Sequence, residues 1–214
     1  MVDRGIFKAY DIRGVVGKTL TVDAVRAVGA ALGRRALAAG VRETVVGRDG
    51  RLSGPELSAA LADGFRDAGV SVVDVGMVTT PIVYYATYEL GTGTGVAVTG
   101  SHNPPDYNGL KMVVAGEALY GDAITALGDE VIRGGAPAVA PGARGGLREA
   151  SVGERYLARV AGDIRLARPM KIAIDCGNGV AGAFAPELFR RIGCEVVELF
   201  CDVDGTFPNH HPDP

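Results

Sequence analysis

The sequence predicts an α/β protein with a mixed, mainly parallel sheet covered by helices (α/β/α), followed by an incomplete second α/β domain. Two observations support this fold class. Helix-like and strand-like segments alternate along most of the 214 residues, as they do in helix-covered parallel sheets. The chain also contains 32 glycines and no tryptophan, which favours many tight turns between strands and helices over a sandwich built on aromatic side chains.

The elements of the first domain follow from local signals. Residues 21–39 have helical composition and end before Gly40, and the β-branched run 43–46 is typical of a strand. The stretch from Ser53 to Glu56 has the pattern of a capping box with a proline in the first turn, and it begins a helix that stops at Gly69. The other expected elements are a strand at 70–75, a helix from 79 to about 90, and strands at 95–98, 109–114 and 117–120.

A segment rich in glycine, alanine and proline separates the two predicted domains. Between Gly134 and Gly146 the sequence GGAPAVAPGARGG has no apolar periodicity, which is typical of a loop or linker. We therefore expect a first domain at residues 1–140 and a partial second domain at 147–214. The second begins with helix 151–162, strand 170–175, a glycine-rich turn, helix 180–192 and strand 195–200. Its two strands are fewer than an independently stable sheet usually needs, so this domain is expected to be truncated.

The composition argues against several classes of function. The net charge is −3 and the basic residues are scattered, so no nucleic-acid partner is expected. No apolar run approaches the roughly 20 residues of a membrane span, and no signal peptide is recognisable, so we expect a cytoplasmic protein without a membrane partner.

The cysteines are expected to be reduced, buried thiols. There are three of them, an odd number without a CxxC pair. A metal cluster is the less favoured alternative, because its ligand spacings match no familiar pattern. It would combine Cys194, Cys201, His210 and His211 and leave out Cys176.

The segment KIAIDCGNGVAG is one candidate binding site. Gly177 to Gly182 fit the pattern G-x-G-x-x-G between a strand and a helix, and Glu198 lies near the end of the next strand, as in dinucleotide-binding domains. Such a turn allows close approach of a pyrophosphate to a helix N-terminus. The pattern is short in a glycine-rich chain, and the further strands of a Rossmann domain do not follow. NAD or FAD binding is therefore the less favoured alternative.

The stretch VAVTGSHNPPDYNGLKM, residues 96–112, contains the main catalytic candidate. Ser101 follows a strand and a glycine and precedes a rigid Asn-Pro-Pro, so we expect it on a stiff, exposed loop. His102 could assist an alcohol nucleophile, and Lys111 could transfer a proton or stabilise phosphoryl oxygens. A turn without catalytic function is the alternative, because the G-x-S-x-G elbow and a Ser-His-Asp order are absent.

Arginines in two predicted loops add candidate phosphate ligands. YDIRG (10–14) and GRDGR (47–51) place Arg13, Arg48 and Arg51 beside glycines. Guanidinium groups suit phosphate or phosphoserine, whereas the alternative for each is a solvated surface arginine.

Five motifs together resemble, in order and spacing, the α-D-phosphohexomutases of the phosphoglucomutase/phosphomannomutase type. They cover nearly the whole chain and are FKAYDIRG, VVGRDGRLSG, VTGSHNPPDYNGLK, AIDCGNGVAG and DGTFPNHHPDP. The resemblance implies a phosphoserine enzyme, an isomerase of carbohydrate metabolism. It would interconvert hexose 1-phosphate and hexose 6-phosphate, of glucose, mannose or both, through a hexose 1,6-bisphosphate intermediate.

The resemblance also implies roles for single residues. Ser101 would be the nucleophile and phosphoryl carrier, and Lys111 the general acid/base, with His102 as the third catalytic residue. Arg13 and Tyr10 would be supporting residues, and Asn103 would shape the loop. Together with Arg48 of the GRDGR loop, these residues are the expected substrate and phosphate ligands. Mg²⁺ would bind the phosphate on Ser101, but the DGDGDR loop that supplies its other ligands in the family is absent from this chain. Phosphoryl transfer depends mainly on positioning and on cationic stabilisation, which agrees with these residue types.

The family's sugar-selecting and distal phosphate-binding domains are also absent from this chain. We therefore expect an N-terminal part of a longer mutase, inactive by itself, with missing C-terminal domains. A truncated, non-catalytic interaction module that exposes its unfinished sheet edge is a further alternative.

Overall fold

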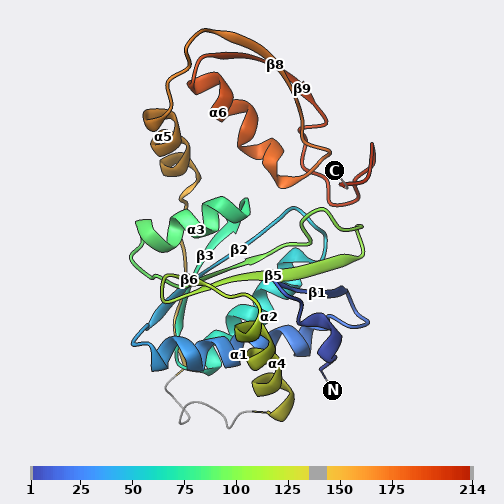
Figure 1. Ribbon diagram of the computed structural model, residues 1–214, viewed down its shortest axis with the longest axis vertical. Coiled ribbons are helices and arrows are strands. Elements are labelled where there is room, and N and C mark those ends of the chain that lie inside the picture. The colour runs from blue at the N-terminus through green and yellow to red at the C-terminus, as the bar shows by residue number, and fades with distance from the viewer. Residues whose placement is uncertain (1, 135–143, 213–214) are drawn as a thin grey trace.

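The computed structural model describes residues 2–134 and 144–212, which form two α/β units (Figure 1). The first unit is built on a seven-stranded mixed sheet and the second on a pair of parallel strands. The predicted fold class, a mixed α/β sheet covered by helices, is confirmed. None of the helices in the described ranges is both long and apolar enough to cross a membrane.

The sheet of the first unit has a parallel part and an antiparallel part. Its strands are β1 (Ile12–Val15), β2 (Glu43–Arg48), β3 (Ser71–Met77), β4 (Gly95–Val98), β5 (Tyr107–Val114), β6 (Glu117–Ala118) and β7 (Leu147–Glu149). They follow the order β1-β5-β4-β2-β3-β7, with β6 paired to β5. Strands β4, β2, β3 and β7 are parallel, whereas β5 pairs antiparallel with β1, β4 and β6. The ends of β2 and β4 therefore point the same way, and the candidate site lies at these ends.

Helices cover both faces of this sheet. They are η1 (Arg4–Ile6), α1 (Val22–Ala38), α2 (Gly54–Asp67), α3 (Thr80–Glu89) and α4 (Asp122–Arg133). Figure 1 shows α1, α2 and α4 on one face and α3 on the other, between the sheet and the second unit. Each face has its own apolar core, one around Leu32, Leu61 and Phe65 and one around Ile82 and Val83. Burial of such side chains stabilises the unit by about 1.5–3 kcal/mol each.

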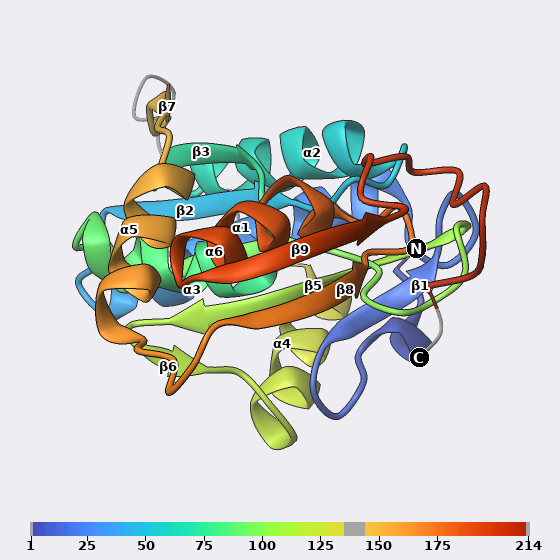
Figure 2. The same cartoon turned by 90° about the horizontal axis from the view of Figure 1, so that it is seen from above.

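The second unit contains α5 (Gly153–Asp163), β8 (Met170–Asp175), η2 (Val180–Ala183), α6 (Ala185–Arg191) and β9 (Cys194–Leu199). It contacts the first unit through an edge-to-face pair of Tyr85 and Tyr156, whose ring centroids are 5.5 Å apart. Seen from above, its C-terminal segment and the loop between β4 and β5 lie on the same side of the molecule (Figure 2). Two segments far apart in sequence are thereby brought together.

Two local predictions need correction, and three further elements were missed. Ser53 does not cap α2: its side chain makes no cap hydrogen bond, and its Oγ accepts one from Asn108 Nδ2 at 2.9 Å instead. The predicted helix 180–192 is divided at Phe184 into η2 and α6. The elements β1, α4 and β7 were not predicted at all.

The predicted linker from Gly134 to Gly146 lies mostly outside the described residues. Gly145 is described, and its N–H donates to the carbonyl of Arg66 at 2.9 Å. Strand β7 then pairs with β3, so the chain leaves the first sheet only after Glu149. The limits 1–140 and 147–214 stay a prediction.

Candidate active site

Ser101 lies on a strained loop at the end of β4 that is held by hydrogen bonds. Its φ of 53° is in the left-handed region, which is uncommon for residues other than glycine and typical of functional loops. The Ser101 N–H donates to Thr99 Oγ1 at 2.9 Å, and the side chain is exposed. The loop therefore presents the hydroxyl outward, as the sequence predicts.

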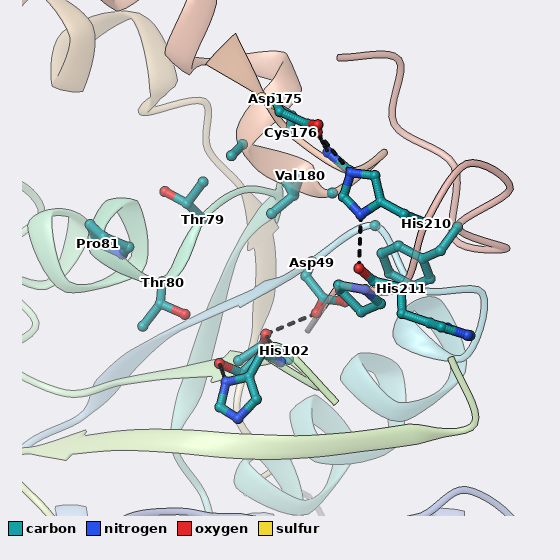
Figure 3. Close-up of a pocket in the computed structure, with 18 residues that line it drawn as sticks. Asp49, Thr79, Thr80, Pro81, His102, Asp175, Cys176, Val180, His210 and His211 are labelled. Carbon is teal, nitrogen blue, oxygen red and sulfur yellow. Dashed lines mark hydrogen bonds and ion pairs between the residues drawn. The ribbon is translucent and has the colours of Figure 1, made fainter. Parts of the chain in front are cut away.

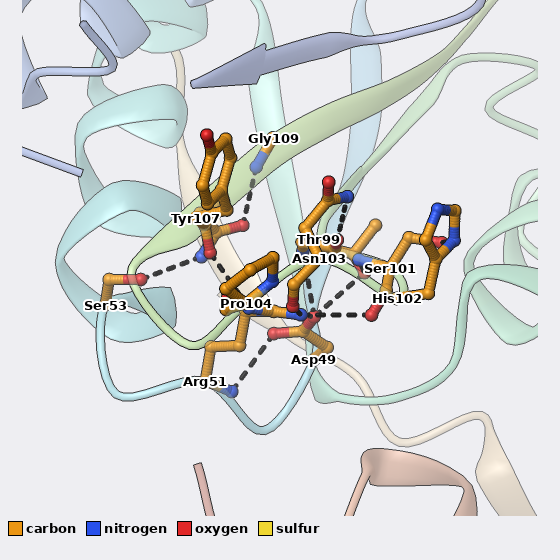
Figure 4. Close-up of polar contacts among 12 residues, drawn as sticks. Asp49, Arg51, Ser53, Thr99, Ser101, His102, Asn103, Pro104, Tyr107 and Gly109 are labelled. Atoms are coloured by element: carbon orange, nitrogen blue, oxygen red, sulfur yellow. Dashed lines mark hydrogen bonds and ion pairs between the residues drawn. The ribbon is translucent and has the colours of Figure 1, made fainter. Parts of the chain in front are cut away.

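Asp49, at the end of the neighbouring strand β2, holds the beginning of this loop (Figure 4). Its Oδ2 accepts hydrogen bonds from Thr99 Oγ1 at 2.8 Å and from the Gly100 N–H at 3.1 Å. The same oxygen pairs with Arg51 Nε at 3.3 Å, and Oδ1 accepts the Arg51 N–H at 3.1 Å. One carboxylate thus connects the two loops that follow β2 and β4.

Arg51 holds the rest of the loop, and the prediction that it binds phosphate or faces solvent is wrong. Its side chain is 1% exposed. Nη1 donates to the carbonyls of Pro104 (2.6 Å) and Tyr107 (3.0 Å), and Nη2 to those of Ser101 (3.0 Å) and Asn103 (2.6 Å). Burial lowers the pKa of Arg51, and the Asp49 carboxylate opposes this shift. The donors are saturated by the loop, so Arg51 has a structural function.

A buried carboxylate gathers two cationic side chains beside the loop. Strand β1 pairs antiparallel with β5, and Asp11 Oδ2 lies 2.9 Å from Arg13 Nη2 and 3.8 Å from Lys111 Nζ. Arg13 Nη1 also donates to Asn103 Oδ1 at 3.3 Å, and Asn103 Nδ2 donates to the Gly100 carbonyl at 2.7 Å. The predicted residues Arg13, Lys111 and Asn103 are therefore brought together next to the serine loop.

Asp11 was missed in the sequence, although it stands two residues before Arg13 in YDIRG. Asp11 Oδ1 and Arg13 Nε are buried and have no hydrogen-bond partner among the described residues. Unpartnered buried polar atoms are costly, so they mark this cluster as a place where function, rather than stability, sets the residue choice.

Of the other predicted site residues, His102 lies beside Ser101, whereas Tyr10 and Arg48 make no contact with its side chain among the hydrogen bonds of the described residues. His102 Nδ1 lies 3.4 Å from Ser101 Oγ, within reach of its proton. Tyr10 is 78% exposed. Arg48 pairs with Asp74 at 3.7 Å and lines a separate cavity that also contains Pro55. Among the described residues, the hydrogen-bond partners of Ser101 are Thr99, His102 and Arg51, and they include neither Tyr10 nor Arg48.

A cavity of about 580 Å³ lies between the two units and is lined by both (Figure 3). The first unit contributes Ser101 and His102 to its wall, and the second contributes Asp175, Gly177 and His210 among others. The Ser101 hydroxyl thus borders a space large enough for a small polar ligand, since ligand pockets are typically about 300–1,000 Å³.

His210 lies on the second unit's side of this cavity, with an acceptor beside each of its ring nitrogens. Its Nδ1 lies 2.9 Å from the His211 carbonyl oxygen and its Nε2 2.9 Å from Asp175 Oδ1. Both contacts, the carbonyl first, raise the pKa of His210. The pKa of Asp175 is lowered, mainly by His210 and then by the Gly177 N–H. A ring whose two nitrogens face acceptors is stabilised in its charged form.

The glycine motif forms a packed turn. Gly177 and Asn178 have φ of 49° and 60°, and a Cβ on Gly182 would lie 1.9 Å from the Cys201 carbonyl oxygen. Asn178 Nδ2 donates to the Asp202 carbonyl at 2.9 Å. The turn leads into the four-residue 3₁₀ helix η2, whereas a dinucleotide fingerprint needs an α-helix N-terminus. Packing against the C-terminal segment therefore explains these glycines.

The three cysteines are free, but only Cys194 is buried. Cys176 and Cys201 are half-buried, with their Sγ atoms 3.5 Å apart, and burial raises the pKa of Cys176 to about 12. Within residues 2–134 and 144–212 there is no group of three or more His, Cys, Asp or Glu side chains that could hold a metal ion.

The fold and the site define a two-unit α/β protein that presents a serine to a cavity between its units. The chain belongs to the phosphoglucomutase/phosphomannomutase family. Residues 4–133 match the family's alpha/beta/alpha domain I, and residues 154–214 match its alpha/beta/alpha domain II. The resemblance expected from the five motifs is confirmed, and the dinucleotide-binding alternative is not favoured.

Individual relatives agree with this assignment. A phosphoglucomutase of Neisseria meningitidis is 53% identical over 213 residues, which make up 100% of this chain and 46% of that protein. A phosphomannomutase/phosphoglucomutase of Pseudomonas aeruginosa is 52% identical over 98% of this chain and 44% of its own length. The crystal structure of a family protein from Burkholderia thailandensis, 52% identical, superposes with a TM-score of 0.90 over 100% of this chain and 47% of that one. The chain spans about half the length of the curated relatives it matches.

Proposed function

We propose that Ser101 carries the phosphoryl group in a phosphohexomutase that interconverts hexose 1-phosphate and hexose 6-phosphate of glucose, mannose or both. The observation that carries the proposal is the fixed, exposed Ser101 loop bordering the cavity between the units. Because the chain spans about half of its relatives, the full reaction would require C-terminal domains in addition to these residues.

The residues around Ser101 suit one half of this reaction. In transfer from a hexose 1,6-bisphosphate, Ser101 Oγ forms the new bond to phosphorus, and the sugar oxygen leaves with the electron pair of the bond that breaks. His102, 3.4 Å from Ser101 Oγ, would accept the hydroxyl proton. Lys111 would donate a proton to the leaving sugar oxygen, and Arg13 would stabilise the charge on the phosphoryl oxygens. Asn103 would keep Arg13 oriented toward the loop. Tyr10 and Arg48 stay predicted ligands of the phosphorylated hexose.

The described residues do not supply a magnesium site. Near the loop, Asp49 is engaged with Thr99, Gly100 and Arg51, and Asp175 is engaged with His210. Mg²⁺ usually needs several oxygen ligands in octahedral geometry. We propose that Ser101 contributes to a Mg²⁺ site only through its phosphate, and that the remaining ligands come from outside this chain.

The test is peptide mapping by mass spectrometry after incubation with glucose 1,6-bisphosphate or mannose 1,6-bisphosphate and Mg²⁺. It is done on this chain and on a chimera in which the C-terminal half of the Pseudomonas aeruginosa relative follows Pro214. We expect one added phosphoryl group on Ser101 in the chimera and none in its Ser101→Ala variant. Ser151→Ala is the matched control, because Ser151 is exposed outside the cavity lining, and it should keep the modification. A chimera that is folded and left unphosphorylated at Ser101 by both sugars would overturn the proposal.

A further inference from the structure

Arg51 contacts the backbone of the nucleophile loop through both terminal nitrogens of its guanidinium group. Four carbonyl oxygens between residues 101 and 107 point at one guanidinium group, at 2.6 to 3.0 Å. A guanidinium offers five N–H donors in a rigid plane, whereas a lysine ammonium offers three on a flexible stem. The conformation of the loop is therefore matched to arginine in particular.

The space around the guanidinium is filled on the loop side. A Cβ on Gly100 would lie 2.2 Å from Arg51 Cζ and Nε, so the backbone just before Ser101 packs directly on the charged group. Asp49 is the ionised partner of Arg51 and also bonds the Gly100 N–H. The start of the loop is thus held to the same ion pair as its end.

The second unit closes the other side of the guanidinium. The ring of Phe207 stacks against Arg51, with Cζ 5.2 Å from the ring centroid, a distance typical of a cation–π contact. The backbones meet here as well, because a Cβ on Gly205 would lie 2.5 Å from the Gly50 carbonyl oxygen. Phe207 and Ser101 both line the cavity between the units.

We propose that Arg51 is a positioning residue for Ser101, and that Phe207 couples this function to the second unit. Contact of the Gly205 to Phe207 segment excludes water from the guanidinium and strengthens its bonds to the loop carbonyls, because hydrogen bonds gain strength in a low dielectric. The nucleophile is then held in its transfer geometry only while the second unit is docked. The catalytic part of this inference rests on the proposed function of Ser101.

The first test measures loop order directly. The amides of Gly100, Ser101 and Asn103 are hydrogen-bonded within the site, so their hydrogen exchange can be followed by NMR. We expect Arg51→Lys to speed their exchange about tenfold or more, and Phe207→Leu about three- to tenfold, the scale of a desolvated cation–π contact. Phe207→Tyr keeps the ring and should restore slow exchange.

The second test measures phosphorylation of Ser101 by a hexose 1,6-bisphosphate in the chimera. We expect Phe207→Leu to lower the maximal rate several-fold with little change in KM, because the loop affects geometry more than binding. Arg148→Lys is the control, since Arg148 pairs with Glu43 at the surface of the first unit and should leave exchange and rate unchanged.

The outcomes separate the two proposals. If wild-type Ser101 is not phosphorylated but loop exchange responds to Phe207→Leu, the proposed function fails and the positioning of the loop stands. If Ser101 is phosphorylated and both Arg51→Lys and Phe207→Leu leave exchange and rate within twofold of wild type, the positioning proposal is overturned. Should Arg51→Lys fail to fold, the amide exchange of Phe207→Leu compared with that of Phe207→Tyr still tests whether Phe207 orders the loop.

Discussion

Replacing Asp49 with asparagine tests how the serine loop is stabilised. The Asp49 side chain is 12% exposed, and its two oxygens accept four hydrogen bonds. Asparagine has nearly the same shape but only one acceptor oxygen. If that oxygen takes the place of Oδ2, the amide nitrogen faces the Arg51 N–H, and a donor then opposes a donor.

The expected loss of stability in Asp49→Asn has two sources. A neutral hydrogen bond contributes about 1 kcal/mol net, and the bond to the Arg51 N–H is lost. The guanidinium of Arg51 also loses its ionised partner, and breaking a buried pair costs about 3–5 kcal/mol when the other charge has nothing else to bind. Here the carbonyls of the loop still accept from Arg51, so only part of that cost applies. We expect Asp49→Asn to lower the free energy of unfolding of the first unit by about 2–4 kcal/mol.

The assay is urea unfolding followed by circular dichroism, with Asp163→Asn as the matched control. Asp163 pairs with Arg159 one helical turn away, and both side chains are more than 60% exposed. Exposed pairs of this kind contribute about 0.5 kcal/mol or less, so the control should unfold almost as the wild type does. An Asp49→Asn variant within about 1 kcal/mol of the control would refute the view that this carboxylate stabilises the two loops.

Two further predictions concern packing and charge. Gly64→Ala should destabilise the first unit by about 1–3 kcal/mol in urea unfolding, because an added Cβ would lie 2.1 Å from the Arg26 carbonyl oxygen where α1 crosses α2. The same change at Gly162, where a Cβ meets nothing within 4 Å, should stabilise by about 0.5–1 kcal/mol, and equal effects at both glycines would contradict the argument. The raised pKa of His210 means that its contacts with the His211 carbonyl and with Asp175 add stability that is fully present below the ordinary value of 6.5 and is lost as pH rises through the folded value. The lowered pKa of Asp175 removes the contribution again in acid, as pH falls through its own folded value. The difference in Tm between wild type and His210→Gln should therefore shrink as pH rises above 6.5, and a constant difference would count against the pair.

The sequence predicts the fold well where elements have strong local signals. Strands 95–98 and 170–175 agree with β4 and β8 to the residue, because each is a compact run with a strand-like composition. Strand β1 was missed because IRGV is short and contains an arginine and a glycine. Helix α4 was missed although Ile124, Leu127 and Val131 place apolar side chains at helical spacing, so periodicity could have found it.

The functional site could be predicted from the sequence only in part. Ser101, His102 and Asn103 could be predicted because the rigid motif itself places them on one loop. Arg51 could not be assigned correctly, because its function depends on carbonyl groups more than 50 residues away in the chain. A charged residue beside a glycine has the same local pattern whether it faces solvent, binds a ligand or is buried against the backbone.

Arg51 also explains how a strained serine can be stable without a ligand. A left-handed serine costs on the order of 1 kcal/mol or more, and an exposed loop has few apolar contacts to offset this. The bonds from Arg51 to the loop carbonyls each stabilise by about 1 kcal/mol, and more where the charge assists them, so together they exceed the cost. The conformation of the Ser101 loop is therefore set by the protein before any phosphate arrives, which is the condition under which a positioned hydroxyl can favour phosphoryl transfer.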